Sequence, residues 1–299
     1  MFSKVLLATD LSKGSAEVAR CVHGLKPLGT KEIILAECLK TLEAFSMAYS
    51  EDVEKFKASL IEQENIVKEQ EFSVKSETVF GSVHTEIDRL IKKYDCNAVM
   101  VPSLGHTMLS DILLGNLASE LINHITKPLL LVRLKVVDTN NEDKKTCILA
   151  SSCENFIASI LYATDFSEHA DEAFLYLRKL VKSGAEEVTL LHVQDMVKLA
   201  NESKENIKRF DAIDHGRLSK LRDRLLSINP ALKINLKIIH GKPKSEILKF
   251  ANKIDPSLIV LGTQGRGYVG DIFLGSISYT IARNSLTLVL LIPKTGENK

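Results

Sequence analysis

The sequence lacks a strong excess of charge of either sign. Its 39 lysines and arginines are balanced by 38 aspartates and glutamates, which gives a formal charge of +1 at pH 7. The two kinds of charge are interleaved, and there is no basic tract of the kind that gives electrostatic affinity for nucleic acid. We therefore expect no nucleic-acid partner.

Long apolar runs and paired cysteine motifs are also absent. No run is long enough to span a bilayer, and the N-terminal MFSKVLLATD enters a strand pattern without a signal peptide. The cysteines at positions 21, 38, 96, 147 and 153 form no CxxC. An odd, scattered set is typical of a reducing cytoplasm, where thiols fill the core, although an approach of Cys147 and Cys153 stays open. We expect a soluble cytoplasmic protein with no membrane partner.

Several catalytic and metal-binding motifs are missing. The sequence has no GxxxxGK[ST], no GxSxG, no Ser-His-Asp order, no HExxH and no paired-carboxylate arrangement. The first strand pattern of each half is followed by ATDLSKGS or ATDFSEHA in place of GxGxxG, which argues against a nicotinamide-dependent dehydrogenase. We assign no catalytic residue and no metal ligand, and slow ATP hydrolysis is the most that we expect.

What the sequence does contain is an internal repeat. FSKVLLATDLS ends at Ser12 and IASILYATDFS ends at Ser167, so that Asp10 and Asp165 lie 155 residues apart. Later in each copy the offset becomes 160 residues, which means that the second copy has gained about five. At this offset the glycines at 81, 105 and 115 correspond to those at 241, 265 and 275.

Strand and helix patterns alternate within each copy. In the second copy, strands are predicted at 160–163, 188–193, 232–239, 258–261 and 286–292, with helical patterns between them. This alternation predicts an α/β fold with two tandem doubly wound, Rossmann-like domains, each built on a five-stranded parallel sheet. We expect the first domain at 1–137, an exposed polar linker at 138–155 and the second domain at 156–299.

A glycine-rich stretch lies between the fourth strand and the last helix of the second copy. From Ile259 to Ser276 it reads IVLGTQGRGYVGDIFLGS. Gly265 follows Gly262 after two residues, and Gly275-Ser276 follows after nine more. A strand, a glycine turn and a helix start point backbone N–H groups and a helix dipole at one spot, which suits a phosphate. The glycines allow close approach and positive φ, and Ser276 suits the N-cap. Glycines that only make turns remain the alternative.

Three of the predicted strands carry candidate ligand-binding residues at their carboxyl ends. Asp165, Val193 and Gly262 are expected to share the crevice at which strand order reverses. Asp165 can hydrogen-bond a ligand or cap the helix that follows it. We interpret His192 as structural, and Arg266 is equally compatible with a phosphate partner and with a solvated loop charge.

These motifs together resemble the universal stress protein family in its tandem two-domain form. The resemblance is carried by LYATDFSEHADEAF, by TLLHV, by the His-Gly before a helix, and by Gly262-x-x-Gly265-(nine residues)-Gly275-Ser276. The last pattern is similar to the motif of the family's ATP-binding branch. The resemblance covers nearly all of both halves. It implies an adenine nucleotide alpha hydrolase-like fold, binding of ATP or AMP, Mg²⁺ held through the phosphates, and a regulatory role in stress response.

The resemblance also implies which residues hold the nucleotide. The adenine and ribose would lie against the ends of the first two strands of the second copy, and the phosphates against the glycine-rich stretch. The implied nucleotide-binding residues are Ala163, Thr164, Asp165, Val193, Gly262, Thr263, Gly265, Arg266, Gly275, Ser276 and Ile277.

The first copy departs from this pattern. Pro102 stands where the second copy has Gly262, so that a backbone N–H is lost. Asn116 replaces Ser276, and His106 replaces Arg266. We therefore expect the first copy to bind nucleotide poorly or not at all.

The family also pairs its domains through the last strand. The resemblance thus implies that 129–134 pairs with 288–292 within one chain, and that whole chains form homodimers. Two other functions stay open, namely a nucleotide-independent scaffold or interaction protein and a weak ATPase.

Overall fold

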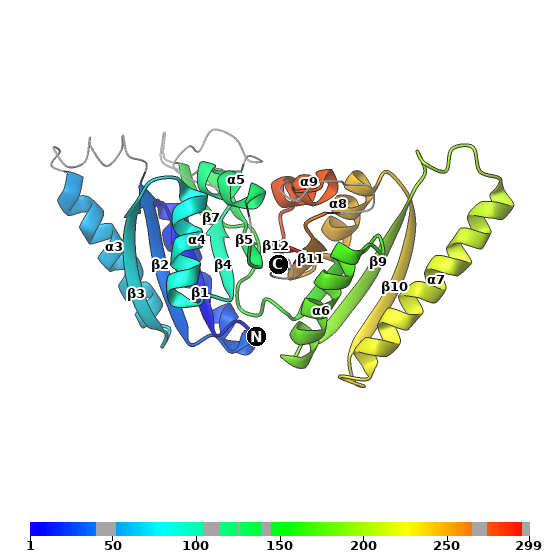
Figure 1. Cartoon of the computed structure of the whole chain (residues 1–299), viewed down its shortest axis with the longest axis horizontal. Helices are drawn as coiled ribbons and strands as arrows, with labels where there is room; N and C mark the ends of the chain where they lie inside the picture. The colour runs from blue at the N-terminus through cyan, green and yellow to red at the C-terminus, as the bar shows by residue number, and fades with distance from the viewer. Residues whose placement is uncertain (40–51, 104–113, 125, 139–144, 265–273, 295–299) are drawn as a thin grey trace. The chain divides into compact units, whose positions relative to one another are not determined.

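The computed structural model describes residues 1–39, 52–103, 114–124, 126–138, 145–264 and 274–294. The chain divides into two compact units, Met1–Glu154 and Asn155–Lys299. Each unit contains five parallel strands with helices packed against them (Figure 1). This confirms the predicted α/β class and the tandem doubly wound domains. Among the described helices, none combines the length and the apolar composition needed to cross a membrane.

The sheet of the first unit has the strand order β5-β4-β1-β2-β3, and all its neighbouring strands run parallel. Its inner strands are buried over nearly their whole length, which fits their continuous apolar runs. The strands are β1 (Lys4–Thr9), β2 (Glu32–Leu39), β3 (Ser73–Phe80), β4 (Ala98–Pro102) and β5 (Leu129–Val132). The helices are α1 (Lys13–Arg20), the 3₁₀ helix η1 (Cys21–Leu28), α3 (Asp52–Lys68), α4 (Val83–Tyr94) and α5 (Asn116–Asn123).

The second unit repeats this topology with the order β12-β11-β8-β9-β10. Strand order reverses between β8 and β11, so a crevice is expected at their carboxyl ends. The strands are β8 (Ser159–Ala163), β9 (Glu187–Asp195), β10 (Lys233–Gly241), β11 (Leu258–Gly262) and β12 (Leu288–Ile292). The helices are α6 (Glu168–Lys182), α7 (Lys204–Leu226), α8 (Pro243–Ile254) and α9 (Ser276–Asn284).

Helix α6 shows how the sequence pattern produces packing. The Ser167 side chain accepts a hydrogen bond from the Ala170 N–H and so caps the first turn. Phe174 and Leu177 recur at helical spacing and are fully buried. The helix contacts β11 and β12. Inside this interface the Tyr162 hydroxyl donates to the Ala170 carbonyl over 2.6 Å, which satisfies a phenol that is otherwise buried.

The segment expected to be an exposed linker is partly folded onto the first unit. Strands β6 (Leu134–Asp138) and β7 (Lys145–Leu149) form an antiparallel hairpin, and β7 contacts α1. The Cys147 thiol is buried, and its burial together with the charge of Asp10 raises its pKa above the ordinary value. The chain passes from one unit to the other between Glu154 and Asn155, after this hairpin.

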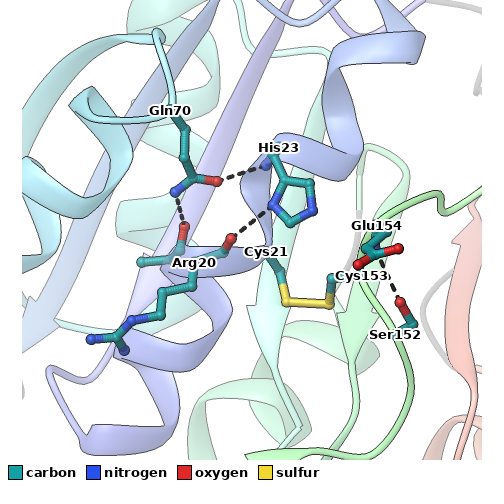
Figure 2. The surroundings of a disulfide bond; sticks show 8 residues. Arg20, Cys21, His23, Gln70, Ser152, Cys153 and Glu154 are labelled. Atoms are coloured by element: carbon teal, nitrogen blue, oxygen red, sulfur yellow. Dashed lines mark hydrogen bonds between the residues drawn. A yellow bond between two sulfur atoms is a disulfide. The ribbon is translucent and has the colours of Figure 1, made fainter.

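A disulfide joins Cys21 to Cys153 (Figure 2). The expectation that the cysteines are unpaired core thiols is therefore wrong for these two residues. The partner of Cys153 is Cys21, at the start of η1, and Cys147 stays free. A sequence separation of 132 residues offers no local signal for such a pair, because only the folded sheet brings the two ends together. The bond fastens the last residues of the first unit to η1.

We predict that this bond stabilises the first unit. Disulfides typically stabilise a protein by about 2–4 kcal/mol, and the chain-entropy model gives about 5 kcal/mol for a loop of 132 residues. Adding a reductant should lower the urea midpoint of the wild type. The double variant Cys21→Ser/Cys153→Ser should unfold at the reduced wild-type midpoint and should not respond to the reductant. A wild type whose midpoint is the same with and without the reductant would contradict the bond.

Gly262, at the end of β11, packs directly against the first turn of α6. A Cβ at this position would lie 2.5 Å from the His169 carbonyl oxygen and 2.8 Å from its carbon. These are backbone atoms, so no side-chain rotation relieves the contact. Glycine is thus required here by the closeness of strand and helix, whether or not a ligand is bound.

Replacing Gly262 with alanine should therefore destabilise the second unit. We expect a loss of about 1–3 kcal/mol in the free energy of unfolding, as overpacking of a core typically gives. Gly216→Ala is the matched control, since a Cβ there meets nothing within 4 Å and the residue lies inside α7. The control should be neutral or stabilised by up to about 1 kcal/mol. Equal urea midpoints for the two variants would disprove the packing argument.

Candidate functional site

The second unit contains a cavity of about 1000 Å³ at the carboxyl ends of its central strands. The ends of β8, β9 and β11 line it, together with the first turns of α8 and α9 and the N-terminal half of α7. This is the crevice that the reversal of strand order predicts. Its volume is in the range of small-molecule and cofactor sites.

The lining differs between the two sides of the cavity. On the β11 and α9 side it is mostly small or polar, with Gly262, Gln264, Gly275, Ser276 and Ser278 beside Leu261 and Ile277. On the β9, α7 and α8 side, apolar residues lie beside polar and charged ones. The apolar residues are Val193, Val197, Leu199, Phe210, Ile213 and Ile247, and the polar and charged ones include His192, Gln194, Asp214 and Arg217. The cavity therefore suits a ligand with one polar end and one flat end that also carries hydrogen-bonding groups.

A tight turn follows β8 and forms part of the wall. Thr164 Oγ1 accepts from the Phe166 N–H over 2.9 Å, and Asp165 Oδ1 accepts from the Ser167 N–H over 3.0 Å. These two bonds hold Phe166 at φ 58°, in the left-handed region. Asp165 thus supports its own turn, and the N-cap of α6 is Ser167.

The first unit builds the same turn. Thr9 Oγ1 accepts from the Leu11 N–H over 2.9 Å, Asp10 Oδ1 accepts from the Ser12 N–H over 3.1 Å, and Leu11 has φ 56°. The repeated Ala-Thr-Asp is therefore explained in both units by turn chemistry. Whatever Asp165 contributes to a ligand comes in addition to this structural role.

The N-cap of α9 lies one residue before the predicted position. The N-cap is Gly275, with φ −59° and ψ 144°, and Ser276 is the first helical residue. Ser276 is therefore not the N-cap, and neither Gly275 nor Gly262 has the positive φ that was expected of these glycines. Ser278, one turn into the helix, donates from Oγ to the Gly262 carbonyl over 2.7 Å, which ties α9 to β11.

The structure brings most of the predicted nucleotide-binding residues to this cavity. Thr263 is an exception, because it is buried and does not line the cavity. Its N–H donates to the Ile292 carbonyl over 3.0 Å. Gly265 and Arg266 lie outside the described residues. The predicted residues that line the cavity are Ala163, Thr164, Asp165, Val193, Gly262, Gly275, Ser276 and Ile277.

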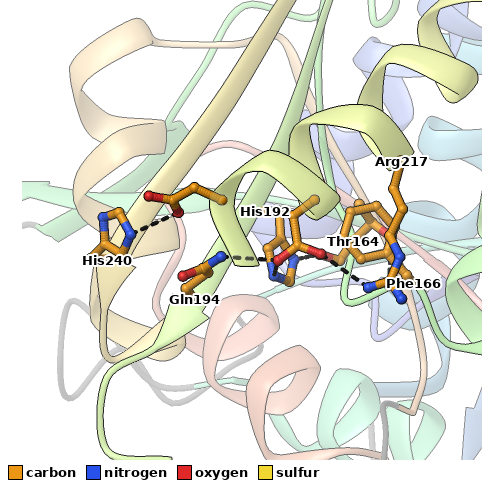
Figure 3. Close-up of polar contacts among 8 residues, drawn as sticks. Thr164, Phe166, His192, Gln194, Arg217 and His240 are labelled. Carbon is orange, nitrogen blue, oxygen red and sulfur yellow. Dashed lines mark hydrogen bonds and ion pairs between the residues drawn. The ribbon is translucent and has the colours of Figure 1, made fainter. Parts of the chain in front are cut away.

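A buried polar cluster, which we call the Asp214 cluster, was not predicted (Figure 3). Asp214 lies on α7 and is 8% exposed. Its Oδ2 accepts from Gln194 Nε2 over 3.0 Å and lies 3.4 Å from His192 Nε2, while its Oδ1 accepts from Arg217 over 3.0 Å. These four residues also line the cavity. The sequence contains one signal for this cluster. Asp214 lies four residues after Phe210 and four before Leu218, so an acidic residue stands on an otherwise apolar face of the helix.

His192 has the structural environment that was expected of it. Its Nδ1 lies 2.8 Å from the Thr164 carbonyl oxygen, and its ring packs against Phe166 in a tilted arrangement with the centroids 4.7 Å apart. The Arg217 guanidinium also lies over the Phe166 ring, 5.3 Å from its centroid. The turn after β8 is thereby joined to β9 and α7, which gives this side of the cavity a packed wall.

Comparison with solved structures supports the tandem fold. A universal stress protein from Archaeoglobus fulgidus superposes with a TM-score of 0.66 and 20% identity, covering 98% of this chain and 99% of its own. A functionally unknown protein, PA1789 from Pseudomonas aeruginosa, gives a TM-score of 0.62 at 14% identity, with 98% and 93% covered. At these identities the likeness concerns the fold.

Comparison of sequences identifies the family. Universal stress protein MJ0577 of Methanocaldococcus jannaschii is 31% identical over 157 residues, which span 45% of this chain and 97% of that protein. Universal stress protein MJ0531 of the same organism is 28% identical over 144 residues, with 47% and 85% covered. The model of the universal stress protein family matches residues 1–133 and again 157–293. Because both halves match that one model, the chain belongs to the universal stress protein family and carries its module twice.

Proposed function

We propose that the second unit binds an adenine nucleotide, ATP or AMP, and that binding serves a regulatory role in stress response. The observation that carries the proposal is the cavity at the crevice, lined on one side by Gly262, Gly275 and Ser276. The spacing of these residues is similar to that of the family's ATP-binding branch. The apolar residues of the opposite side, among them Val193, Ile213 and Ile247, suit a purine ring.

Helix α9 supplies a phosphate-binding end. Its N-terminus opens on the cavity, so its first N–H groups and the positive end of its dipole are available to an anion. Gly275 leaves this end uncovered because it has no side chain. Lys242 and Lys244, at the start of α8, also line the cavity and add positive charge. Mg²⁺ would be held by the phosphates themselves, without a dedicated set of protein ligands.

The first unit is proposed to bind nucleotide poorly. Pro102 is buried at the end of β4, where the second unit has Gly262, and has no N–H to offer. The neighbouring Ser103 is already engaged, since its Oγ accepts from the Leu134 N–H of the hairpin over 3.1 Å. The hairpin that follows β5 thus uses polar groups at this strand end for internal contacts.

A regulatory outcome requires that the nucleotide prefers one conformation over another. We assign no nucleophile and no general base among the described residues around the cavity, and the proposal is therefore regulation without turnover. A weak ATPase would require product formation that disappears when Asp165 or Ser276 is changed. A scaffold independent of nucleotide would purify free of nucleotide and show no thermal shift on addition of ATP.

The glycine at position 275 provides a direct test of the site. Gly275 and Gly115 are corresponding N-cap residues, with φ −59° and −61° and extended ψ, so valine is compatible with the backbone at both. Gly275→Val should weaken ATP binding by at least about tenfold, because the side chain enters the phosphate end; tenfold corresponds to about 1.4 kcal/mol. Gly115→Val should leave the affinity within about twofold. Calorimetric titration measures both, and equal affinities would refute the assignment.

Binding should saturate at one nucleotide per chain. This stoichiometry follows from the difference between Pro102 and Gly262, and native mass spectrometry of the protein with added ATP measures it. Two equivalent sites per chain would show that the proline is tolerated. Adenine nucleotide that co-purifies with the chain would support the proposal independently.

The association of modules is a further part of the proposal. The pairing of 129–134 with 288–292 and the formation of homodimers stay predictions. Sedimentation equilibrium of the full chain, with and without ATP, distinguishes a monomer from a dimer.

A further inference from the structure

We propose that Gln194 selects the base of the nucleotide by accepting a hydrogen bond from the 6-amino group of adenine. The inference rests on the proposed function and adds to it the residue that distinguishes an aminopurine from a purine without that donor. It is carried by the environment of one buried amide in the Asp214 cluster.

Gln194 lies near the end of β9, is 3% exposed and lines the cavity. Its Nε2 donates to Asp214 Oδ2 over 3.0 Å. Its Oε1 has no hydrogen-bond partner within the described part of the chain. A buried amide oxygen left without a donor is unfavourable, so a ligand that brings an N–H to this point gains affinity.

The orientation of the amide is fixed by its neighbour. The Asp214 carboxylate only accepts hydrogen bonds, so a flipped amide would set two oxygens against each other over the same 3.0 Å. The Arg217 guanidinium, 3.0 Å from Oδ1, compensates the carboxylate charge and holds it in place. The unused atom is therefore an acceptor, which matches an amino group and opposes a carbonyl.

The position along the sheet fits the base. β8 lies between β9 and β11, so Gln194 is separated by two strand spacings, roughly 10 Å, from the glycine side of the cavity. With the phosphates at the start of α9, the base lies at the β9 side. There Val193, Ile213 and Ile247 provide apolar surface for a ring.

The first unit offers an internal comparison. Gln194 pairs with His240 of β10, and at the corresponding register Leu39 pairs with Phe80 of β3. The acceptor is thus present in the unit that keeps the glycine pattern and is replaced by leucine in the unit that has Pro102. The same comparison shows that leucine is accommodated at this position of the fold.

The test compares two ligands that differ at one group, ATP and purine riboside triphosphate, which has hydrogen in place of the 6-amino group. Wild type should bind ATP more tightly by about 5- to 100-fold, the range expected for a buried donor–acceptor pair. In Gln194→Leu this preference should fall to within about twofold. Leu39→Met, a change at the corresponding position of the first unit, should keep the wild-type ratio.

Further measurements separate the possible failures. Circular dichroism and thermal melting establish that Gln194→Leu is folded, and Gln194→Met serves if it is not. An unchanged ratio in a folded variant overturns the inference and leaves the proposed function standing. Gln194→Leu could instead keep the preference for the amino group and lose the discrimination against 2′-deoxy-ATP. That result assigns the contact of Gln194 to the ribose and also overturns the inference. If neither nucleotide binds wild type, both proposals fall.

Discussion

The site depends on the close contact between the end of β11 and the first turn of α6. Gly262 makes this contact possible, because any side chain would meet the His169 carbonyl at 2.5 Å. The Gly262 carbonyl also accepts a hydrogen bond from the Ser278 hydroxyl, so α9 is positioned by β11, the strand that α6 covers. One glycine thus contacts the first turn of α6 and, through its carbonyl, the first turn of α9. The cavity between them follows from this packing.

Elements with a regular hydrophobic period could be predicted from the sequence, whereas features made by distant residues could not. The continuous apolar runs of β8 and β11 and the helical spacing of Phe174 and Leu177 are local signals, and the structure contains both strands and helix α6 as predicted. The disulfide of Cys21 with Cys153 depends on tertiary folding. So does the hairpin that contains Cys147, since a polar segment with few apolar residues shows no period.

The positions of the candidate residues could be predicted best where the backbone determines where a residue lies. Strand ends and the helix start bring Asp165, Val193 and Gly275 to one cavity, which follows from topology alone. The physical reason given for the glycines was less accurate, because Gly275 has an ordinary φ of −59°. The Asp214 cluster was missed because its hydrogen bonds join β9 to α7 through side chains, and the spacing along the chain shows only an isolated acid on an apolar helix face.

Comparison of the two units separates what the fold needs from what a ligand needs. Both units build the Thr-Asp turn with the same hydrogen bonds and the same left-handed residue, so this turn belongs to the module itself. They differ where a nucleotide would touch the protein, at Pro102 and Gly262 and at Leu39 and Gln194. The buried amide of Gln194, with its unused oxygen, has a leucine in its place in the first unit. This difference supports the proposal that the second unit is the one that holds the ligand.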